Sequence, residues 1–278
     1  MKKKILVVIS NYGTKQLPYL KGVLQEYNNF KKYKIKIILL TTEYIKNLNY
    51  PNLAIKQEIF DKSLGLWLTH KHKKYIFENK NYFDIFIYSE NDIPINEDNL
   101  DIFRKHSENL KNTNLILGFL RYEQKNKYLI DCHPRHTASR IRFYSLIKPF
   151  LSFLPFSIVK KYKLHPIVRK FNIKINNHNY FEVQNVHQGS YVLAKEHLKK
   201  VLDSGNYFNE KINYAGIREG AASNVYIMCG LTKVISIEDL ENSLIHHLPD
   251  SYIDVHPTYI KEQALTPKQL KDLIKKHI

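Results

Sequence analysis

The order of apolar and polar positions along the chain predicts β-strands that alternate with α-helices. Runs rich in β-branched and aromatic residues indicate strands, and apolar residues three and four apart indicate helices. The expected strands cover residues 4–9, 35–41, 53–59, 83–88, 114–122, 181–186, 190–193 and 233–237. The expected helices cover residues 16–27, 64–78, 96–110, 195–202, 219–229 and 267–277. Such alternation favours a mainly parallel sheet with helices on both faces, and therefore an α/β fold.

Length and composition allow one large domain or two small ones. The chain has 278 residues, of which 44% are hydrophobic, and no run approaches the ~20 apolar residues that a membrane-spanning helix needs. The start resembles a signal peptide, but its apolar run 5–9 is too short and no small-residue cleavage site follows. Two cysteines, Cys132 and Cys229, form neither a disulfide framework nor a metal-binding spacing. We therefore expect a protein of the cytoplasm, where thiols stay reduced.

Two carboxylates follow the apolar strand 83–88. This strand runs directly into Ser89, Glu90, Asn91 and Asp92. Ligands of open α/β sheets bind at the carboxyl ends of the strands, and an acid-x-acid pair there can hold a hard divalent cation, which in turn holds a diphosphate. A strand that runs into an ordinary polar turn would have the same residues, with Asp92 as a turn residue.

The net charge of +17 is concentrated in one part of the chain. Residues 132–181 contain no Asp or Glu, but they contain the strongly apolar piece 143–159 and ten basic residues. The ten are Arg135, Arg140, Arg142, Lys148, Lys160, Lys161, Lys163, Arg169, Lys170 and Lys174. Basic residues interleaved with aromatic ones fit anionic lipid head groups or a phosphate-bearing acceptor. Core helices with solvated charged faces and a nucleic-acid surface are the alternatives, although no nucleic-acid-binding motif occurs in the sequence.

Four short pieces, taken in order, resemble a nucleotide-sugar glycosyltransferase of the GT-A type. They are the strand end Ser10-Asn11, the pair Glu90-x-Asp92, the glycine-containing turn 186–191, and the stretch 218–223 followed by His246-His247. The second piece matches the DxD-like position of that fold in a Glu-x-Asp form, whereas many members have Asp at both positions. The resemblance covers most of the chain. It implies one GT-A-like, Rossmann-type catalytic domain over residues 1–278, with 132–181 as a basic insertion that faces the acceptor or the membrane.

The resemblance implies a Mn²⁺ or Mg²⁺ ion bound by Asp92, with Glu90, and completed by a late histidine. A divalent ion stabilises the negative charge that develops on a departing nucleoside diphosphate. His246 and His247 are both candidates for the late histidine. Because adjacent residues of a strand or loop point in different directions, we expect only one of them to bind the ion.

A donor site and a general base are also implied. The residues assigned to the donor, preferably a UDP-sugar, are Ser10, Asn11, Thr41, His70, Glu90 and Asn91. Glu219 is the candidate base, because inverting transfer needs a carboxylate within ~2.6–3.2 Å of the acceptor hydroxyl. The small residues after Glu219 would let a sugar approach closely. Asp250 is the competing carboxylate; Glu219 would equally favour the dipole of a helix that starts there, and His70 would equally suit a solvated helix face.

These inferences together predict a glycosyltransferase of surface-polysaccharide synthesis that acts on a glycan or lipid-linked acceptor, peripheral at the inner face of an anionic membrane. One alternative is a non-catalytic basic protein that binds membranes or nucleic acid, with nucleic acid the less favoured partner. Another is a nucleotidyltransferase, which also uses a carboxylate-held metal ion. That activity needs a glycine-rich phosphate loop near the first strand, where the segment 10–13 offers only Gly13.

Overall fold

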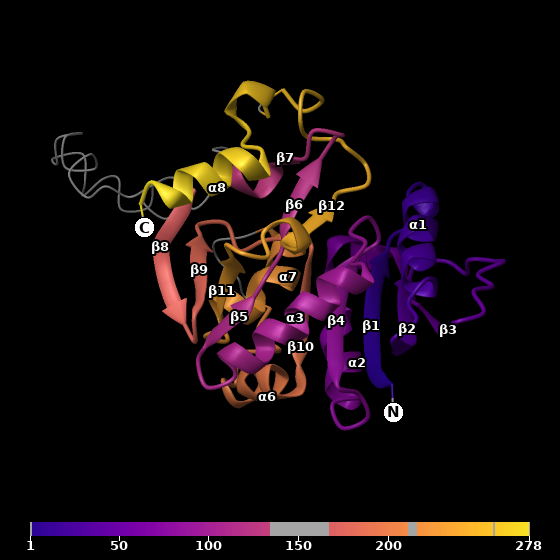
Figure 1. Cartoon of the computed structure of the whole chain (residues 1–278). Helices are drawn as coiled ribbons and strands as arrows, with labels where there is room; N and C mark the ends of the chain where they lie inside the picture. Colours follow the sequence, from indigo (N-terminus) through magenta and orange to yellow (C-terminus); the bar gives the residue numbers. More distant parts are fainter. Residues whose placement is uncertain (1, 134–166, 211–215, 258, 278) are drawn as a thin grey trace, which may run out of the picture.

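The computed structural model describes residues 2–133, 167–210, 216–257 and 259–277. These residues form a mixed α/β fold with multi-stranded sheets flanked by helices, so the expected α/β class is confirmed (Figure 1). Most of the basic insertion, including the apolar piece 143–159 and seven of its ten basic residues, lies outside the described residues. Within the described parts, no helix has the length and apolarity needed to cross a membrane.

The largest sheet has five strands in the order β10-β4-β1-β2-β3. Its members are β1 (Lys3–Asn11), β2 (Tyr33–Thr41), β3 (Leu53–Ile59), β4 (Ile85–Glu90) and β10 (Ser190–Ala194). The first four strands are parallel to one another, and β10 runs antiparallel to β4. The register pairs Ser10 with Glu90 and Asn11 with Thr41, so the carboxyl ends of β1, β2 and β4 lie at one edge of the sheet.

Two smaller sheets complete the framework, with strand orders β5-β11-β9-β8 and β12-β6-β7. Their strands are β5 (Leu115–Leu117), β6 (Leu120–Glu123), β7 (Tyr128–Leu129), β8 (Val168–Ile175), β9 (His178–Val183), β11 (Thr232–Ser236) and β12 (Leu244–His246). The segment 114–122, expected to be one strand, is therefore divided between two sheets at Gly118. A Cβ atom on Gly118 would lie 2.5 Å from Cγ of Lys233, so the close approach of this buried lysine requires a glycine.

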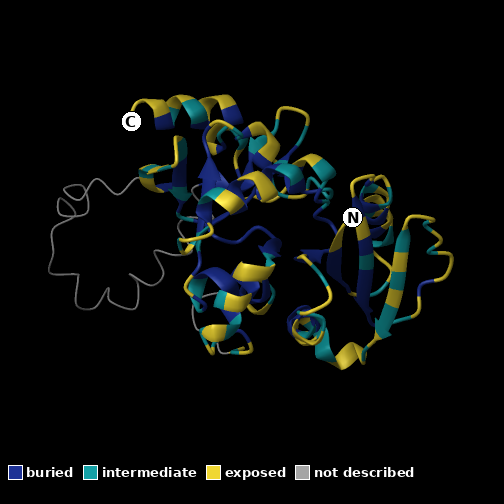
Figure 2. Ribbon diagram, turned by 60° about the horizontal axis from the view of Figure 1, so that its bottom comes forward, coloured by how far each residue is buried: buried dark blue, intermediate teal, exposed yellow. Residues whose placement is uncertain are grey.

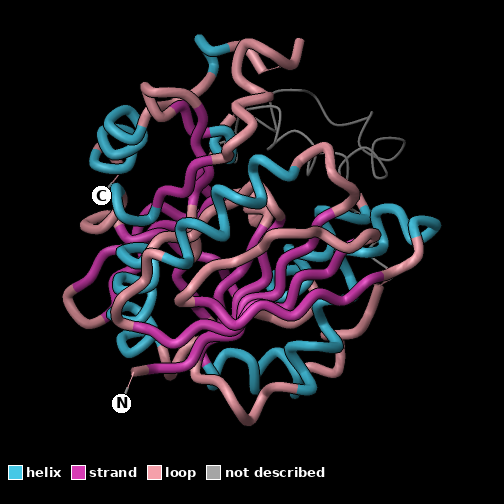
Figure 3. Tube along the Cα trace, turned by 90° about the vertical axis from the view of Figure 1, so that its right-hand side faces the viewer, coloured by secondary structure: helices cyan, strands magenta, loops and turns pink. Residues whose placement is uncertain are grey.

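Helices lie on both sides of the strands (Figure 3). The α-helices are α1 (Leu17–Asn28), α2 (His72–Glu78), α3 (Glu97–Leu110), α6 (Lys195–Asp203), α7 (Ile217–Ile227) and α8 (Pro267–Lys275). Short 3₁₀ segments are η1 (Lys62–Lys71), η2 (Ile130–Cys132), η3 (Glu241–Ser243) and η4 (Lys261–Gln263). The expected helix 64–78 thus begins as η1, which is interrupted at Gly65 with φ of 50°, and becomes α-helical only at His72.

Buried residues concentrate in the strands of the sheets (Figure 2). The largest apolar cluster surrounds the five-stranded sheet and extends to β5 and β11 through Ile116 and Val234. A second cluster packs α8 onto the small sheets, with Leu270 and Ile274 of the helix against Leu120 and Phe181. Because Leu120 belongs to this cluster, the core fixes β6, the strand that ends at Glu123.

Candidate functional site

The acidic stretch predicted from the sequence lies at the carboxyl end of β4. Glu90 is the last residue of that strand, and Glu90, Asn91 and Asp92 are all buried. The amide nitrogen of Asn91 donates to Oδ1 of Asn11 at 2.6 Å, which ties the stretch to the end of β1. The structure therefore brings Asn11, Glu90, Asn91 and Asp92 to the same edge of the five-stranded sheet.

A close approach of the turn before β10 holds this stretch in place. The backbone N–H of Glu90 donates to the carbonyl of Gly189 at 2.9 Å. Gly189 has a φ of +64°, and a Cβ atom there would lie 2.9 Å from Cγ1 of Ile93. Both the left-handed backbone and the lack of space require glycine at this position. The turn 186–191, expected beside the site, is therefore in contact with it.

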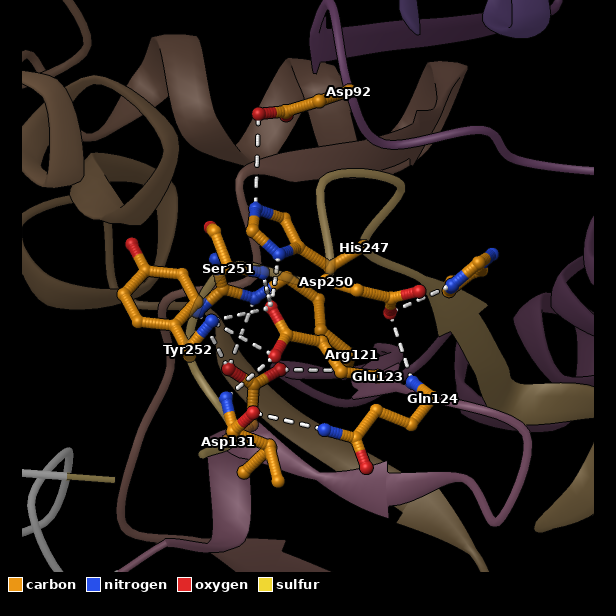
Figure 4. Close-up of polar contacts among 11 residues, drawn as sticks. Asp92, Arg121, Glu123, Gln124, Asp131, His247, Asp250, Ser251 and Tyr252 are labelled. Atoms are coloured by element: carbon orange, nitrogen blue, oxygen red, sulfur yellow. Dashed lines mark hydrogen bonds and ion pairs between the residues drawn. The ribbon is translucent and has the colours of Figure 1, made fainter. Parts of the chain in front are cut away.

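His247 faces Asp92 from the opposite side of the site, as Figure 4 shows. Its Nε2 lies 3.7 Å from Oδ2 of Asp92, and the backbone N–H of Leu248 donates to the Asp92 carbonyl at 3.1 Å. Burial acts to lower the pKa of His247, but its bonds to Asp92 and Glu123 outweigh burial and raise that pKa above the ordinary value. Oδ1 of Asp92 is buried and has no hydrogen-bond partner among the described residues.

His246 has different partners. Its Nε2 lies 3.0 Å from Oδ1 of Asp250, and its ring stacks on Tyr122 with centroids 5.1 Å apart. Asp250 also accepts from the backbone N–H of Gln124 at 2.8 Å. Of the two candidate histidines, His247 is thus the one next to Asp92, whereas His246 and Asp250 pair with each other.

Arg218 is a site residue that the sequence did not single out. It lies in the first turn of α7, and its Nε is 3.6 Å from Oε2 of Glu90. Burial raises the pKa of Glu90, the Arg218 charge opposes that rise, and the Asp92 charge adds to it. The Arg218 side chain is 43% exposed, so this guanidinium can also meet an anionic ligand from solvent.

Glu219, the candidate base, caps the helix on which Arg218 lies. Its Oε2 accepts from the backbone N–H of Gly216 at 2.8 Å, and the residue is exposed. This is the arrangement expected from a carboxylate in the first turn of a helix, where it also favours the helix dipole. A catalytic role for Glu219 stays a prediction.

The remaining donor-site candidates lie around the same edge. Ser10 precedes Asn11 at the end of β1, Thr41 ends β2 and pairs with Asn11, and Thr41 donates through Oγ1 to the Glu43 carbonyl at 3.0 Å. Nε2 of His70 lies 2.8 Å from the Ile217 carbonyl, so His70 ties η1 to the start of α7. Burial lowers the pKa of His70, and the bond to the Ile217 carbonyl opposes that shift. His70 thereby helps to fix Arg218.

Exposed aromatic rings accompany this edge. Tyr12, which follows β1 directly, is 51% exposed and donates through its hydroxyl to the Lys62 carbonyl at 3.1 Å. Trp67 on η1 is 39% exposed, and its ring centroid lies 5.1 Å from that of His70. Neither ring was singled out from the sequence, because single exposed aromatics in loops carry no pattern.

A layer of buried charges lies beneath His247 (Figure 4). Arg121 donates through Nε and Nη2 to Oδ1 of Asp131 at 3.0 and 2.7 Å, and both side chains are buried. Glu123, two residues along β6, accepts from Nδ1 of His247. Sequence reasoning does not single out these residues, since an Arg and two acids in and after a strand look like solvated positions.

Few side chains that could bind a metal ion lie at this site. No group of three or more His, Cys, Asp or Glu that could hold a metal ion occurs among the residues that the structure describes. Asp92 and His247 face each other as a pair, and Asp92 offers a buried oxygen without a partner. Mg²⁺ is commonly bound by one or two carboxylates together with substrate phosphates and water. The pair therefore fits a cation that a bound diphosphate also ligates.

Comparisons with known proteins assign no family to this geometry. No protein-family model matches the sequence, and no curated protein matches it either.

Proposed function

We propose that this chain is a nucleotide-sugar glycosyltransferase of the GT-A type. In this proposal, it moves a sugar from a UDP-sugar to a glycan or lipid-linked acceptor with the help of Mn²⁺ or Mg²⁺. The observation that carries the proposal is the contact between Asp92 and His247, 3.7 Å apart at the carboxyl end of β4. Two residues so distant in sequence meet where ligands of parallel α/β sheets bind.

The cation would be held by Asp92 and His247. Glu90, two residues before Asp92, would add its negative charge to the same site. Once bound, such an ion neutralises the charge that a departing diphosphate gains. Arg218 would bind the same diphosphate from the other side, because its side chain is 43% exposed and its Nε lies 3.6 Å from Oε2 of Glu90. An arginine fork suits phosphate oxygens particularly well.

The nucleoside would lie toward β1 and β2. Asn11, Ser10 and Thr41 are at the ends of those strands. The exposed Tyr12 follows Asn11, and its hydroxyl donates to the Lys62 carbonyl of η1, the segment that carries the exposed Trp67. A nucleobase stacks on such aromatic faces with little demand on its identity. The polar groups of the strand ends are then available to the ribose and the diphosphate.

The acceptor would approach the start of α7. Glu219 is exposed beside Arg218, so its carboxylate is open to an acceptor hydroxyl while one oxygen caps the helix. General-base catalysis needs this combination of access and a fixed position.

A peripheral position on an anionic membrane is part of the proposal. At the described end of the basic window, Lys170 and Lys174 of β8 are exposed, and the adjoining α8 carries the exposed Lys268 and Lys275. These two elements are neighbours, because the rings of Phe171 and His277 stack with centroids 4.2 Å apart. Each such lysine near an anionic surface contributes about 1 kcal/mol to binding.

Asp92→Asn tests the proposed function directly. The amide keeps the shape of the side chain but removes the charge that holds a hard cation, so we expect Mn²⁺-dependent UDP binding to be lost. Titration calorimetry with UDP, with and without Mn²⁺, measures this, and the melting temperature in EDTA checks the fold. Asp250→Asn is the matched control, since Asp250 pairs with His246 instead, and it should bind UDP normally. Retained Mn²⁺-dependent binding in Asp92→Asn contradicts the proposal.

Arg218→Ala should weaken UDP binding in the presence of Mn²⁺ by about ten- to a hundredfold, the usual effect of losing one hydrogen bond to a charged group. The affinity for Mn²⁺ alone should not fall, because the positive charge of Arg218 beside Glu90 repels a cation. Arg218→Lys keeps the positive charge but loses the forked guanidinium, so its UDP affinity should lie between those of the wild type and Arg218→Ala. The same calorimetric titrations measure all three proteins, and equal UDP affinities would rule out the assigned role.

Glu219→Gln separates catalysis from helix capping. The Gln amide oxygen can still accept from Gly216, so the helix start is kept. Turnover of a UDP-sugar should nevertheless fall by ~10²–10⁴-fold, the usual contribution of a positioned general base, with UDP affinity unchanged. Steady-state kinetics and a UDP titration measure the two quantities. Turnover equal to the wild type would leave Glu219 with the capping role alone.

Charge reversal tests the membrane contact. Replacing Lys170, Lys174 and Lys275 by Glu should release the protein from vesicles that contain anionic lipid, and salt should weaken the wild-type binding. Co-sedimentation across a salt series measures both. The control reverses Lys3, Lys34 and Lys46, three exposed lysines of the β1–β2 region, with the same change in net charge. Equal release by the two triple variants would show an effect of net charge only.

A further inference from the structure

Glu123 is a fully buried carboxylate at the end of β6 that accepts from four N–H groups. Oε1 accepts from Nδ1 of His247 at 2.5 Å and from the backbone of Ser251 at 3.1 Å. Oε2 accepts from the backbone of Ile253 at 2.8 Å, and Tyr252 donates to both oxygens at 3.2 and 3.0 Å. A charged side chain is buried so completely only when it is fully bonded in this way.

These bonds decide which nitrogen of His247 carries the proton. Both oxygens of Glu123 already accept from backbone amides, so the contact with the imidazole requires Nδ1 to be the donor. In the neutral ring, Nε2 then has the free lone pair, and Nε2 is the atom that lies 3.7 Å from Asp92. Glu123, on the Nδ1 side of the ring, thus selects the tautomer that leaves Nε2 free to bind a cation.

The same carboxylate holds the loop beside the site. The backbone of residues 251–253 is bonded to Glu123, and the ring of Tyr252 lies 5.2 Å from that of His247. The backbone N–H of His247 donates to the Tyr122 carbonyl at 2.9 Å, so the histidine is tied to β6 through its backbone as well. Loss of Glu123 would therefore free both the ring and the loop.

We propose that Glu123 is a positioning residue for cation binding: it fixes His247 with Nε2 directed at Asp92 and pins residues 251–253 beside it. Glu123 touches neither the cation nor the substrate, and it acts through His247. This proposal rests on the proposed function, since that function supplies the cation. Carboxylates that orient a metal-binding histidine in this way typically account for 10- to 100-fold in metal affinity.

The carboxylate–histidine pair of Asp239 and His106 provides a matched control away from the site. Oδ2 of Asp239 lies 2.8 Å from Nε2 of His106 and accepts from Lys105 at 2.8 Å. His106 is buried like His247, but its other nitrogen lies 2.8 Å from the Tyr180 hydroxyl, and the pair joins α3 to the segment after β11. Asp239→Asn thus alters a part-buried carboxylate–histidine bond at a place that holds no cation in the proposed function.

The experiment measures Mn²⁺ affinity and stability of the wild type, Glu123→Gln, Glu123→Asp and Asp239→Asn. The free Mn²⁺ signal in electron paramagnetic resonance gives the dissociation constant, and the melting temperature in EDTA gives stability. We expect Glu123→Gln to bind Mn²⁺ 10- to 100-fold more weakly, because its single acceptor oxygen cannot serve both the ring and the loop. Glu123→Asp, which keeps both oxygens, should regain part of the affinity, and Asp239→Asn should lose stability only.

The ¹⁵N chemical shifts of the His247 ring add a readout without any cation. At a pH above the midpoint of the His247 titration, which the same ¹⁵N shifts follow, the neutral wild-type ring should carry its proton on Nδ1, and Glu123→Gln should shift it toward Nε2. A wild-type ring with the proton on Nε2 overturns the proposal, even if every variant at position 123 fails to fold. Wild-type Mn²⁺ affinity in Glu123→Gln overturns it as well. If the wild type binds no Mn²⁺, the proposed function is contradicted instead. The tautomer of the His247 ring still tests the role of Glu123 in that case.

Discussion

The parallel pairing of β1 with β2 and β4 is the constraint on which the rest of the structure depends. Parallel neighbours begin and end at the same edges of a sheet, so side chains that follow three different apolar runs are gathered at one edge. Asn11, Thr41 and Glu90 meet there only because the register pairs Asn11 with Thr41 and Ser10 with Glu90. A shift by one residue would turn these polar side chains to the other face of the sheet and place apolar ones at the edge.

The sequence predicts the site residues at the carboxyl ends of β1, β2 and β4 well, because each of them follows a strong apolar run. Asp92 could be found in that way, and so could the helix that begins near Glu219. His247 could not be told from His246, since nothing local fixes which neighbour turns inward. That choice is made by β6, whose Tyr122 stacks on His246 while Glu123 binds His247. The predicted strand 114–122 stops one residue before Glu123, and its division at Gly118 depends on Lys233, far along the chain.

The second half of the site is built from buried charges rather than from apolar contacts. Arg121 with Asp131, and Glu123 with His247, lie in an interior where an unpaired charge is costly, so every member depends on its partner. Such layers contribute little net stability compared with apolar residues of the same size. They do restrict the arrangement, because few other conformations can satisfy the same donors and acceptors. A pre-arranged set of charges suits a site that must bind a highly charged ligand.

The position of His247 in the chain has a consequence for how the molecule folds. The central sheet needs only β1 to β4 and β10, whose paired residues are 18 apart in β2 and β3 (Ile35 and Leu53) and 109 apart in β4 and β10 (Ile85 and Ala194). His247 reaches across 124 residues to Glu123 and across 155 to Asp92, and closing such long loops adds an entropic cost. The segment 244–253 is held there by the pairing of β12 with β6, by hydrogen bonds to Glu123, and by Leu244, Ile245 and Ile253, which belong to three different apolar clusters. Because the central sheet does not include this segment, a local opening of residues 244–253 would separate His247 from Asp92 while β1 to β4 and β10 stay paired.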